Sequence, residues 1–387
     1  MAMTKNPFNG QLNSNSIFSA IFNMIISQHV FADNIKGTYS ELVDKARVDG
    51  TLLGDTKLYY ATDVLKSRPF LGDSEASNLL NVNRPDSPKC QAITLDTFRQ
   101  IDITIDNYLS KQAFADEGTF SSFNSVILGW IRETKRVYDT TTYNVFIGTT
   151  QSDKQGAKTI DITTATSGLT GLEAKRMTAL TYATEMADIL DDMKDITRSY
   201  NDYGFLRSYN EDDLEIIIRK DVANEITKLD LPTIYHKDGV DITSRCIKIP
   251  GRYFGRAITA SDIGSGKVIG ADGAYDSTKG TLRAAKEFDY NTDENGKPIH
   301  YFPGDALATS GTYVAVVGGL EATDVYLEDP NKIAVIMHKG SVPYMSAFEV
   351  ATSFFNPRSL TENHYLTFGH NTLDYLRNYP FLVIKKG

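Results

Sequence analysis

The sequence predicts an α+β fold, and three patterns carry that prediction. Apolar and polar residues alternate with a period of two over residues 91–106, which is typical of a long extended strand. Apolar residues recur at helical spacing over residues 119–146 with no proline between them, which predicts one helix of about 40 Å. Short strand-like segments separated by turn residues fill the C-terminal part.

The composition excludes several classes of protein. The chain has 387 residues, 41% of them hydrophobic, so it can bury a large core and is neither disordered nor fibrous. Its 49 acidic and 40 basic residues give a net charge of -9, which argues against a dedicated nucleic-acid reader. Cys90 and Cys246 form neither a disulfide framework nor a zinc cluster. Since no segment has the features of a signal peptide or a membrane helix, we expect a soluble protein of a reducing cytoplasm without membrane contact.

The N-terminal region, residues 1–54, is predicted to form an arm. After a polar leader, apolar residues at near-helical spacing predict a helix over 16–31. A second short helix is predicted over 39–48.

Residues 55–107 are predicted to form a long β-hairpin that projects from the subunit. Segments 57–66 and 91–106 both look extended, and the turn-rich segment 71–88 separates them. The second segment would span about 50 Å at ~3.3 Å per residue, far more than an ordinary strand. A two-stranded ribbon of this length has unpaired edges, so we expect other chains to cover it. The residues expected to contact a neighbouring subunit are Leu58, Tyr60, Val64, Ile93, Leu95, Ile101, Ile103 and Ile105.

The helix predicted over 119–146 is expected to bury one apolar stripe. Charged residues, including Lys135 and Asp139, mostly fill the side opposite this stripe. Acidic and capping residues precede the helix, and Gly148 closes it. The residues expected to form its core are Phe123, Ile127, Trp130 and Val137.

An α/β unit is predicted to follow the long helix. A second helix over 171–198 precedes a buried central strand over 213–219 and a short helix over 222–229. Residues 232–311 are irregular and rich in turns, and we interpret them as an elaborated insertion. The remaining strands are predicted at 333–337, 347–355, 365–368 and 381–385.

No motif gives positive support for a catalytic residue, a cofactor or a metal. The segment at 264–267 is glycine-rich, but it lacks the glycine and the hydroxyl residue that a phosphate-binding loop requires. The stretch at 291–296 imitates half of a calcium loop, yet Phe302 stands where the bidentate glutamate should be. The six histidines show no ligand spacing. An enzyme or an ion-dependent module centred on 232–311 remains a rival interpretation, as does a fibre or receptor-binding protein.

The order of these elements resembles the major capsid proteins of tailed bacteriophages, whose fold encapsulins share. The amino-acid sequences of segments 114–120 and 379–386 are most similar to those of head proteins of small short-tailed phages (podoviruses) of Gram-positive cocci. In that family the hairpin is an extended loop that reaches across a neighbour, and the long helix is the spine of the peripheral domain. The resemblance implies an N-terminal arm at 1–54, an extended loop at 55–107, a peripheral domain at 108–165 and 341–387, and an axial domain at 166–340 with the insertion at 232–311.

The resemblance also implies the function and the partners. It implies a structural protein that self-assembles into the icosahedral phage head around double-stranded DNA, without enzymatic activity. The implied partners are copies of the chain in hexamers and pentamers, a separate scaffolding protein, the portal, minor head proteins and the packaged DNA through weak non-specific contact. The protein would reside in the virion and assemble in the cytoplasm of the host bacterium. An encapsulin-like shell is the alternative, which the longer arm and the insertion disfavour.

Overall fold

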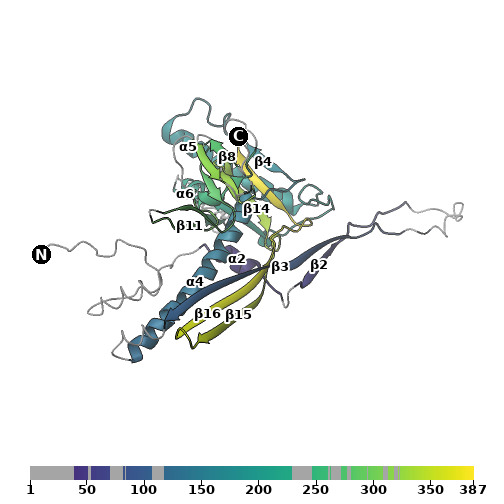
Figure 1. Cartoon of the computed structure of the whole chain (residues 1–387). Coiled ribbons are helices and arrows are strands. Elements are labelled where there is room, and N and C mark those ends of the chain that lie inside the picture. Colours follow the sequence, from purple (N-terminus) through teal and green to yellow (C-terminus); the bar gives the residue numbers. More distant parts are fainter. Residues whose placement is uncertain are drawn as a thin grey trace.

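Two five-stranded sheets and one long helix organise the subunit (Figure 1). The computed structural model describes residues 39–50, 54–69, 82, 84–106, 117–228, 246–259, 262, 272–276, 280–293, 295–307, 313–317, 321 and 323–387. Helix α4 (Glu117–Thr149) confirms the prediction of a single long helix. Its middle packs against one sheet through Ile131 and Tyr138, and its last turns pack against the other through Tyr143 and Ile147.

The central sheet has the strand order β4-β17-β14-β5-β6. β5 and β6 are parallel, as are β4 and β17, whereas β14 is antiparallel to both of its neighbours. The sheet gathers strands from the middle and the end of the chain, so long connections rather than hairpins close it. Its strands are β4 (Ala157–Ile160), β17 (Phe381–Lys386), β14 (Lys332–His338), β5 (Leu214–Arg219) and β6 (Cys246–Ile249).

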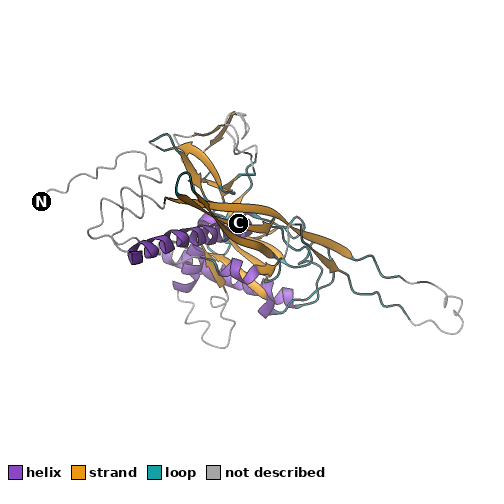
Figure 2. Ribbon diagram, turned by 60° about the horizontal axis from the view of Figure 1, so that its bottom comes forward, coloured by secondary structure: helices purple, strands orange, loops and turns teal. Residues whose placement is uncertain are grey.

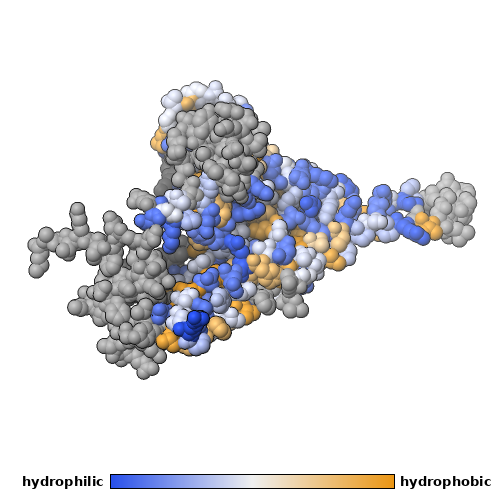
Figure 3. Space-filling model, viewed as in Figure 1, coloured by the Kyte–Doolittle hydropathy of each residue, from blue (hydrophilic) through white to orange (hydrophobic). Residues whose placement is uncertain are grey.

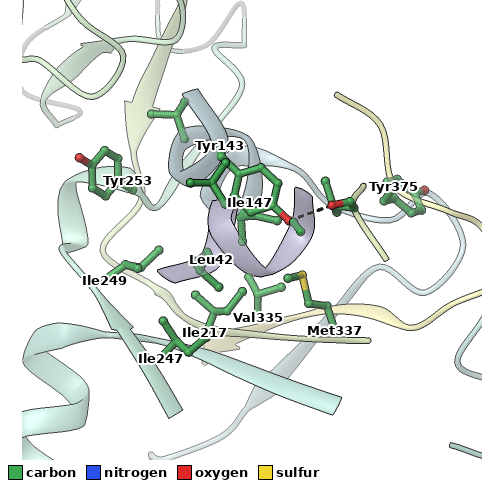
Figure 4. Packing of buried hydrophobic residues seen from close by; sticks show 14 of the residues in the cluster. Leu42, Tyr143, Ile147, Ile217, Ile247, Ile249, Tyr253, Val335, Met337 and Tyr375 are labelled. Atoms are coloured by element: carbon green, nitrogen blue, oxygen red, sulfur yellow. Dashed lines mark hydrogen bonds between the residues drawn. The ribbon is translucent and has the colours of Figure 1, made fainter. Parts of the chain in front are cut away.

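Both faces of the central sheet are buried, which explains why β5 is an unbroken apolar run from Ile216 to Ile218. Ile216 and Ile218 face a cluster formed with α5 (Gly171–Lys194) and α6 (Lys220–Lys228). Ile217 faces the opposite cluster, which contains the end of α4 (Figure 4). On α5, apolar residues at steps of three and four point into the first cluster, as helical periodicity requires. These residues are Ala179, Tyr182, Met186, Ile189, Leu190 and Met193.

The short helix α2 (Glu41–Ala46) anchors the N-terminal segment on the second face of the central sheet. Leu42 and Val43 are each 1% exposed within the same cluster as Tyr143. The Tyr143 hydroxyl donates a hydrogen bond of 2.9 Å to the Val342 carbonyl, so this buried phenol keeps a partner. The helix is part of the expected segment 39–48, while the other predicted helix, over 16–31, lies outside the described residues.

The second sheet, called here the ribbon sheet, has the strand order β1-β15-β16-β3-β2. Its longest strand, β3, has 18 residues and confirms the long extended segment that the alternation predicts. β2 pairs with the first third of β3, and β16 pairs with the rest. The strands are β1 (Arg47–Asp49), β15 (Tyr344–Asn356), β16 (Thr361–Asn371), β3 (Lys89–Asp106) and β2 (Thr56–Ala61).

The pairing of β3 with β16 corrects the prediction of a two-stranded hairpin along its whole length. Only the portion that faces β2 is two-stranded, because the register with β16 runs from Leu95 to Asp106. Ile93 and Leu95 pack in a buried cluster with Met345 and Leu376. The exposed fractions of Ile93, Leu95 and Ile105 are only 4%, 0% and 2%. The subunit itself covers these three side chains, so the expectation that a neighbour covers them does not hold.

Three smaller sheets lie within residues 255–328. One has the order β7-β13-β9, and the other two are the pairs β12-β8 and β10-β11. An apolar cluster of its own, including Leu282, Tyr301 and Leu327, lies within this part of the chain. The strands are β7 (Gly255–Arg256), β8 (Asp272–Asp276), β9 (Leu282–Ala284), β10 (Phe288–Thr292), β11 (Pro298–Tyr301), β12 (Tyr313–Val317) and β13 (Val325–Glu328).

Sheet membership corrects the predicted domain boundaries at three strands. The expectation that 341–387 returns entirely to the peripheral domain does not hold for β17, which pairs with β14 in the central sheet. β4, from the predicted peripheral segment 108–165, pairs with β17. β6 lies inside the predicted insertion 232–311 but pairs with β5, so it belongs to the central sheet.

The core of α4 lies partly at other positions than predicted. Trp130 and Val137 are half-buried, and the side chains of Phe123 and Ile127 lie outside the described residues. Lys135 and Asp139, expected on the side opposite the core, are buried with exposed fractions of 9% and 1%. The α4 residues that belong to the apolar clusters are Ile131, Tyr138, Tyr143, Val145 and Ile147.

Candidate assembly interface

The ribbon, defined here as residues 56–69, 82 and 84–94, carries an uncovered apolar face. In β2, Tyr59 packs toward a buried cluster while Leu58 and Tyr60 point outward. The exposed fractions of Leu58, Tyr60 and Val64 are 54%, 67% and 54%. A strand face in contact with water normally carries polar residues, so these side chains leave an apolar face that the subunit itself does not cover.

The ribbon begins in the ribbon sheet with β2 and β3 and extends beyond it, away from the central sheet (Figures 1 and 2). Leu65 and Val82 are each 77% exposed near the outer end of its described part. Figure 3 shows the hydrophobic colour there, apart from the hydrophobic residues on the body of the subunit. A ribbon of two strands has no second layer of its own to cover such residues.

Hydrogen bonds fix the root of the ribbon to the C-terminal part of the chain. Gln91 is 8% exposed, and its amide donates a hydrogen bond of 2.9 Å to the Tyr375 carbonyl. The backbone N–H of Arg377 donates in return to the Gln91 side-chain oxygen at 3.0 Å. The Asp96 carboxylate accepts a hydrogen bond of 2.7 Å from the backbone N–H of Thr372. The side chains of β3 thereby attach the base of the ribbon to residues 372–377, in addition to the strand pairing.

Asp63 ties the end of β2 to a loop that follows α5. Its carboxylate accepts a hydrogen bond of 2.9 Å from the backbone N–H of Leu206 and one of 2.6 Å from the Arg198 guanidinium. The Leu206 N–H, followed by the Arg198 hydrogen bond, lowers the pKa of Asp63 to about 2. The carboxylate is therefore ionised over the whole physiological range.

The β15-β16 hairpin presents a second group of exposed apolar residues. Val350, Phe354, Phe355 and Leu360 are 37%, 61%, 48% and 44% exposed. Leu360 has a φ of 55°, which is unusual for a residue with a side chain and occurs here in the turn between the strands. Val350 and Phe354 sit an even number of residues apart, so they occupy the same face of β15.

A buried charge network connects α4, β1 and β15, and the sequence interpretation missed it. The Asp139 carboxylate accepts hydrogen bonds from Lys135 at 3.0 Å, Arg47 at 3.1 Å and the Tyr344 hydroxyl at 2.7 Å. Burial, reinforced by the charge of Asp139, raises the pKa of Tyr344. The spacing of Lys135 and Asp139 is a signal for an ion pair on a helix, but it does not reveal that the pair is buried.

A second network joins the ribbon sheet to the β10-β11 hairpin. Arg99 of β3 pairs with Glu287, and its guanidinium lies 5.0 Å from the centre of the Tyr138 ring. The His300 ring nitrogens lie 2.8 Å from Glu287 and 2.7 Å from Asp289. Burial lowers the pKa of His300, but the hydrogen bonds and charges of these two carboxylates outweigh it and raise the pKa.

The structure tests the motifs that the sequence interpretation considered and set aside. The turn between β10 and β11 is closed by Asp293, whose carboxylate accepts hydrogen bonds of 2.9 Å from the backbone N–H groups of Asn295 and Lys297. The described residues contain no group of three or more His, Cys, Asp and Glu side chains placed to bind a metal ion. The glycine-rich segment at 264–267 lies outside them. Among the helices that the structure describes, none combines the length and apolarity needed to span a membrane.

The predicted contact residues thus fall into three groups. Leu58, Tyr60 and Val64 are exposed, as a contact with another chain requires. Ile101 and Ile103 are half-buried against the cluster around Ile131 and Tyr138 of α4. The remaining residues of the predicted set belong to the subunit's own core.

Comparisons with known proteins agree with this architecture. A family model described as Phi29-like phage major capsid protein matches residues 4–385. No curated protein matches the chain in sequence. The fold is similar to a chain of the capsid structure of Staphylococcus phage Andhra, with a TM-score of 0.57 and 10% identity over 93% of this chain and 87% of that chain.

A second solved structure gives the same result. The match is to a chain in the structure of the head fiber and inner core protein gp22 of native bacteriophage P68, with a TM-score of 0.58 and 11% identity over 93% of this chain and 87% of that chain. At such identities the likeness establishes the fold alone. It confirms the α+β capsid fold predicted from the order of the elements.

Proposed function

The chain belongs to the family of Phi29-like phage major capsid proteins, and from this premise we propose that the outward face of its ribbon is a contact between neighbouring subunits of the head shell. The protein is a structural protein of the phage virion and self-assembles into the head shell. The observation that supports the proposed contact is the exposure of Leu58, Tyr60 and Val64 on a ribbon that starts at the edge strand β2 and extends beyond it.

The energetics favour many modest contacts over one strong contact. Burial of a large apolar side chain contributes about 1.5–3 kcal/mol, and association entropy offsets much of what one pair of subunits gains. In a closed shell every subunit makes and receives the same contact, so the gains act together. A surface that is too weak to hold a dimer can therefore hold a shell.

The other partners follow from the family role. We expect the copies to form hexamers and pentamers around double-stranded DNA, and to assemble in the cytoplasm of the host bacterium. A separate scaffolding protein, the portal and minor head proteins are the expected helpers. The net charge of -9 on each subunit suits a capsid shell that contacts the DNA only weakly and does not resist its ejection. We expect the protein to fulfil this role without catalysis.

The proposed contact is tested by replacing the exposed ribbon residues with polar ones. The double variant Leu58→Ser/Tyr60→Ser should yield folded subunits that fail to form shells when it is co-expressed with the other head proteins. A suitable control is Leu172→Ser, because Leu172 is 54% exposed like Leu58 but lies at the start of α5. Circular dichroism reports folding, and sedimentation with negative-stain microscopy reports assembly. Shells of normal yield from the double variant would contradict the proposal.

A further inference from the structure

The ribbon leaves the body of the subunit at Thr62 and Asp63, and both residues are held there from outside the ribbon sheet. The Asp63 carboxylate accepts from the Leu206 N–H at 2.9 Å and from Arg198 at 2.6 Å. The neighbouring carbonyl of Thr62 accepts a hydrogen bond of 2.5 Å from the Arg207 guanidinium. Three hydrogen bonds therefore reach this point from one loop.

That loop, residues 195–207, is itself well braced. The backbones of Thr197 and Arg207 exchange two hydrogen bonds of 2.9 Å, one in each direction. Asn201 is 3% exposed, and its side chain both donates to and accepts from the backbone of Phe205. Arg198 also donates to the Gly204 carbonyl at 2.8 Å, so a hydrogen bond within the loop holds the guanidinium that reaches Asp63.

The loop is attached to the central sheet through α5. It follows α5 directly, and α5 packs on that sheet through the cluster that contains Met193. The backbone N–H of Tyr209 donates to the Met193 carbonyl at 2.9 Å, which closes the loop behind the helix. The hydrogen bonds at Asp63 thus join the ribbon to the central sheet, although the strands of the ribbon belong to the other sheet.

We propose that Asp63 is a positioning residue that sets the angle between the outer part of the ribbon, residues 64–69, and the central sheet, and with it the curvature at which neighbouring subunits join. The inference rests on the proposed contact through the ribbon, of which Val64 belongs to this outer part. About six residues of extended chain beyond Asp63 span ~20 Å, so a rotation of 10° at this point displaces the outer end by about 3 Å. A displacement of that size exceeds the tolerance of a packed interface. Without the hydrogen bonds at Asp63, neighbouring subunits would therefore join at varied angles.

The test compares Asp63→Ala with a matched control on the same ribbon, Asp86→Ala. Asp86 is exposed on the other side of the ribbon. With Asp63→Ala we expect folded subunits, an exchange of the Leu206 amide hydrogen that is about tenfold faster or more, and particles of mixed diameter or open sheets in negative stain. Asp86→Ala should give shells of wild-type diameter with unchanged Leu206 exchange.

A second variant removes the Arg198 side of the hydrogen bonds at Asp63, which are called here the Asp63 clamp. Arg198→Ala should reproduce the mixed particle diameters while leaving the ribbon sequence intact. If Asp63→Ala subunits do not fold, the particle diameters of Arg198→Ala decide whether the hydrogen bonds at Asp63 control curvature. Arg198→Lys keeps the charge and should recover part of the uniform diameter. A uniform wild-type diameter for both Asp63→Ala and Arg198→Ala would overturn the inference.

The design separates failure of this inference from failure of the proposed contact. If the clamp is irrelevant but the ribbon is the contact, Leu58→Ser/Tyr60→Ser blocks assembly while Asp63→Ala gives uniform shells. If the ribbon is not the contact, both variants give uniform shells of normal yield. Either result overturns the role of Asp63, and only the second overturns the proposed contact as well.

Discussion

Replacement of Asp139 by alanine should destabilise the subunit more than any change at the proposed contact. The carboxylate is 1% exposed and accepts hydrogen bonds from Lys135, Arg47 and Tyr344. It lies in the middle of α4 and joins this helix to β1 and to β15. Its loss would therefore loosen the spine, the N-terminal segment and the ribbon sheet together.

The magnitude follows from what remains after the carboxylate is removed. The Lys135 side chain is 11% exposed and would keep a contact of 3.5 Å with Glu349 and its position 5.3 Å from the centre of the Phe368 ring, but no buried carboxylate. The Tyr344 hydroxyl would lose its acceptor inside the protein, which costs about 1–3 kcal/mol. Arg47 is the least affected, because its side chain is 37% exposed and also reaches Asp44. Breaking a buried pair of this kind costs about 3–5 kcal/mol in total.

The assay is denaturant unfolding of the free subunit, followed by circular dichroism. Asp102→Ala is the matched control, because Asp102 is an exposed aspartate in β3, and its loss should change the free energy of unfolding by less than about 0.5 kcal/mol. The pair Lys135→Met/Asp139→Leu should lose less stability than Asp139→Ala alone, since it leaves no unpaired buried charge. A loss below about 1 kcal/mol for Asp139→Ala would refute the reasoning.

Two further predictions concern the ribbon sheet and the network around His300. Ile105→Ala should lower the free energy of unfolding of the subunit by about 2–5 kcal/mol, whereas Leu58→Ala should leave it nearly unchanged. Thermal unfolding of both variants shows which of the two residues belongs to the core of the subunit. The raised pKa of His300 means that its ion pairs stabilise the fold fully below the ordinary histidine pKa and lose this effect as pH rises through the folded-state pKa. His300→Gln should remove that pH-dependent part of the free energy of unfolding. The part removed should be less than about 1 kcal/mol, because the His300 side chain is 48% exposed. A variant whose stability depends on pH as in the wild type would contradict this prediction.

Sequence patterns that depend only on neighbouring residues predicted the elements well. The alternation over 91–106 and the helical stripe over 119–146 each correspond to a single element, β3 and α4. The unbroken apolar run at 216–218 is the centre of β5, buried on both faces. These signals are local because side-chain direction repeats every 2.0 residues in a strand and every 3.6 in a helix.

The partners of those elements could not be predicted in the same way. Alternation along β3 shows that one face is buried, but a neighbouring subunit and the subunit's own α4 would leave the same pattern. Charged residues on α4 read as a solvent-exposed side, although Lys135 and Asp139 neutralise each other in the interior. The Asp63 clamp has no sequence signal either, because its main donor is the backbone N–H of Leu206.

The unusual length of β3 has a structural reason. A two-stranded ribbon alone would be only marginally stable, so its base needs support from the rest of the subunit. From Leu95 to Asp106 the same strand is paired with β16, and Ile105 is buried there. The inner part of β3 is therefore the anchor of the ribbon. The part that pairs with β2 is held as well, because Gln91 and Ile93 are buried there. Since β3 also packs against α4 through Ile101 and Ile103, one strand connects the ribbon to the core of the subunit.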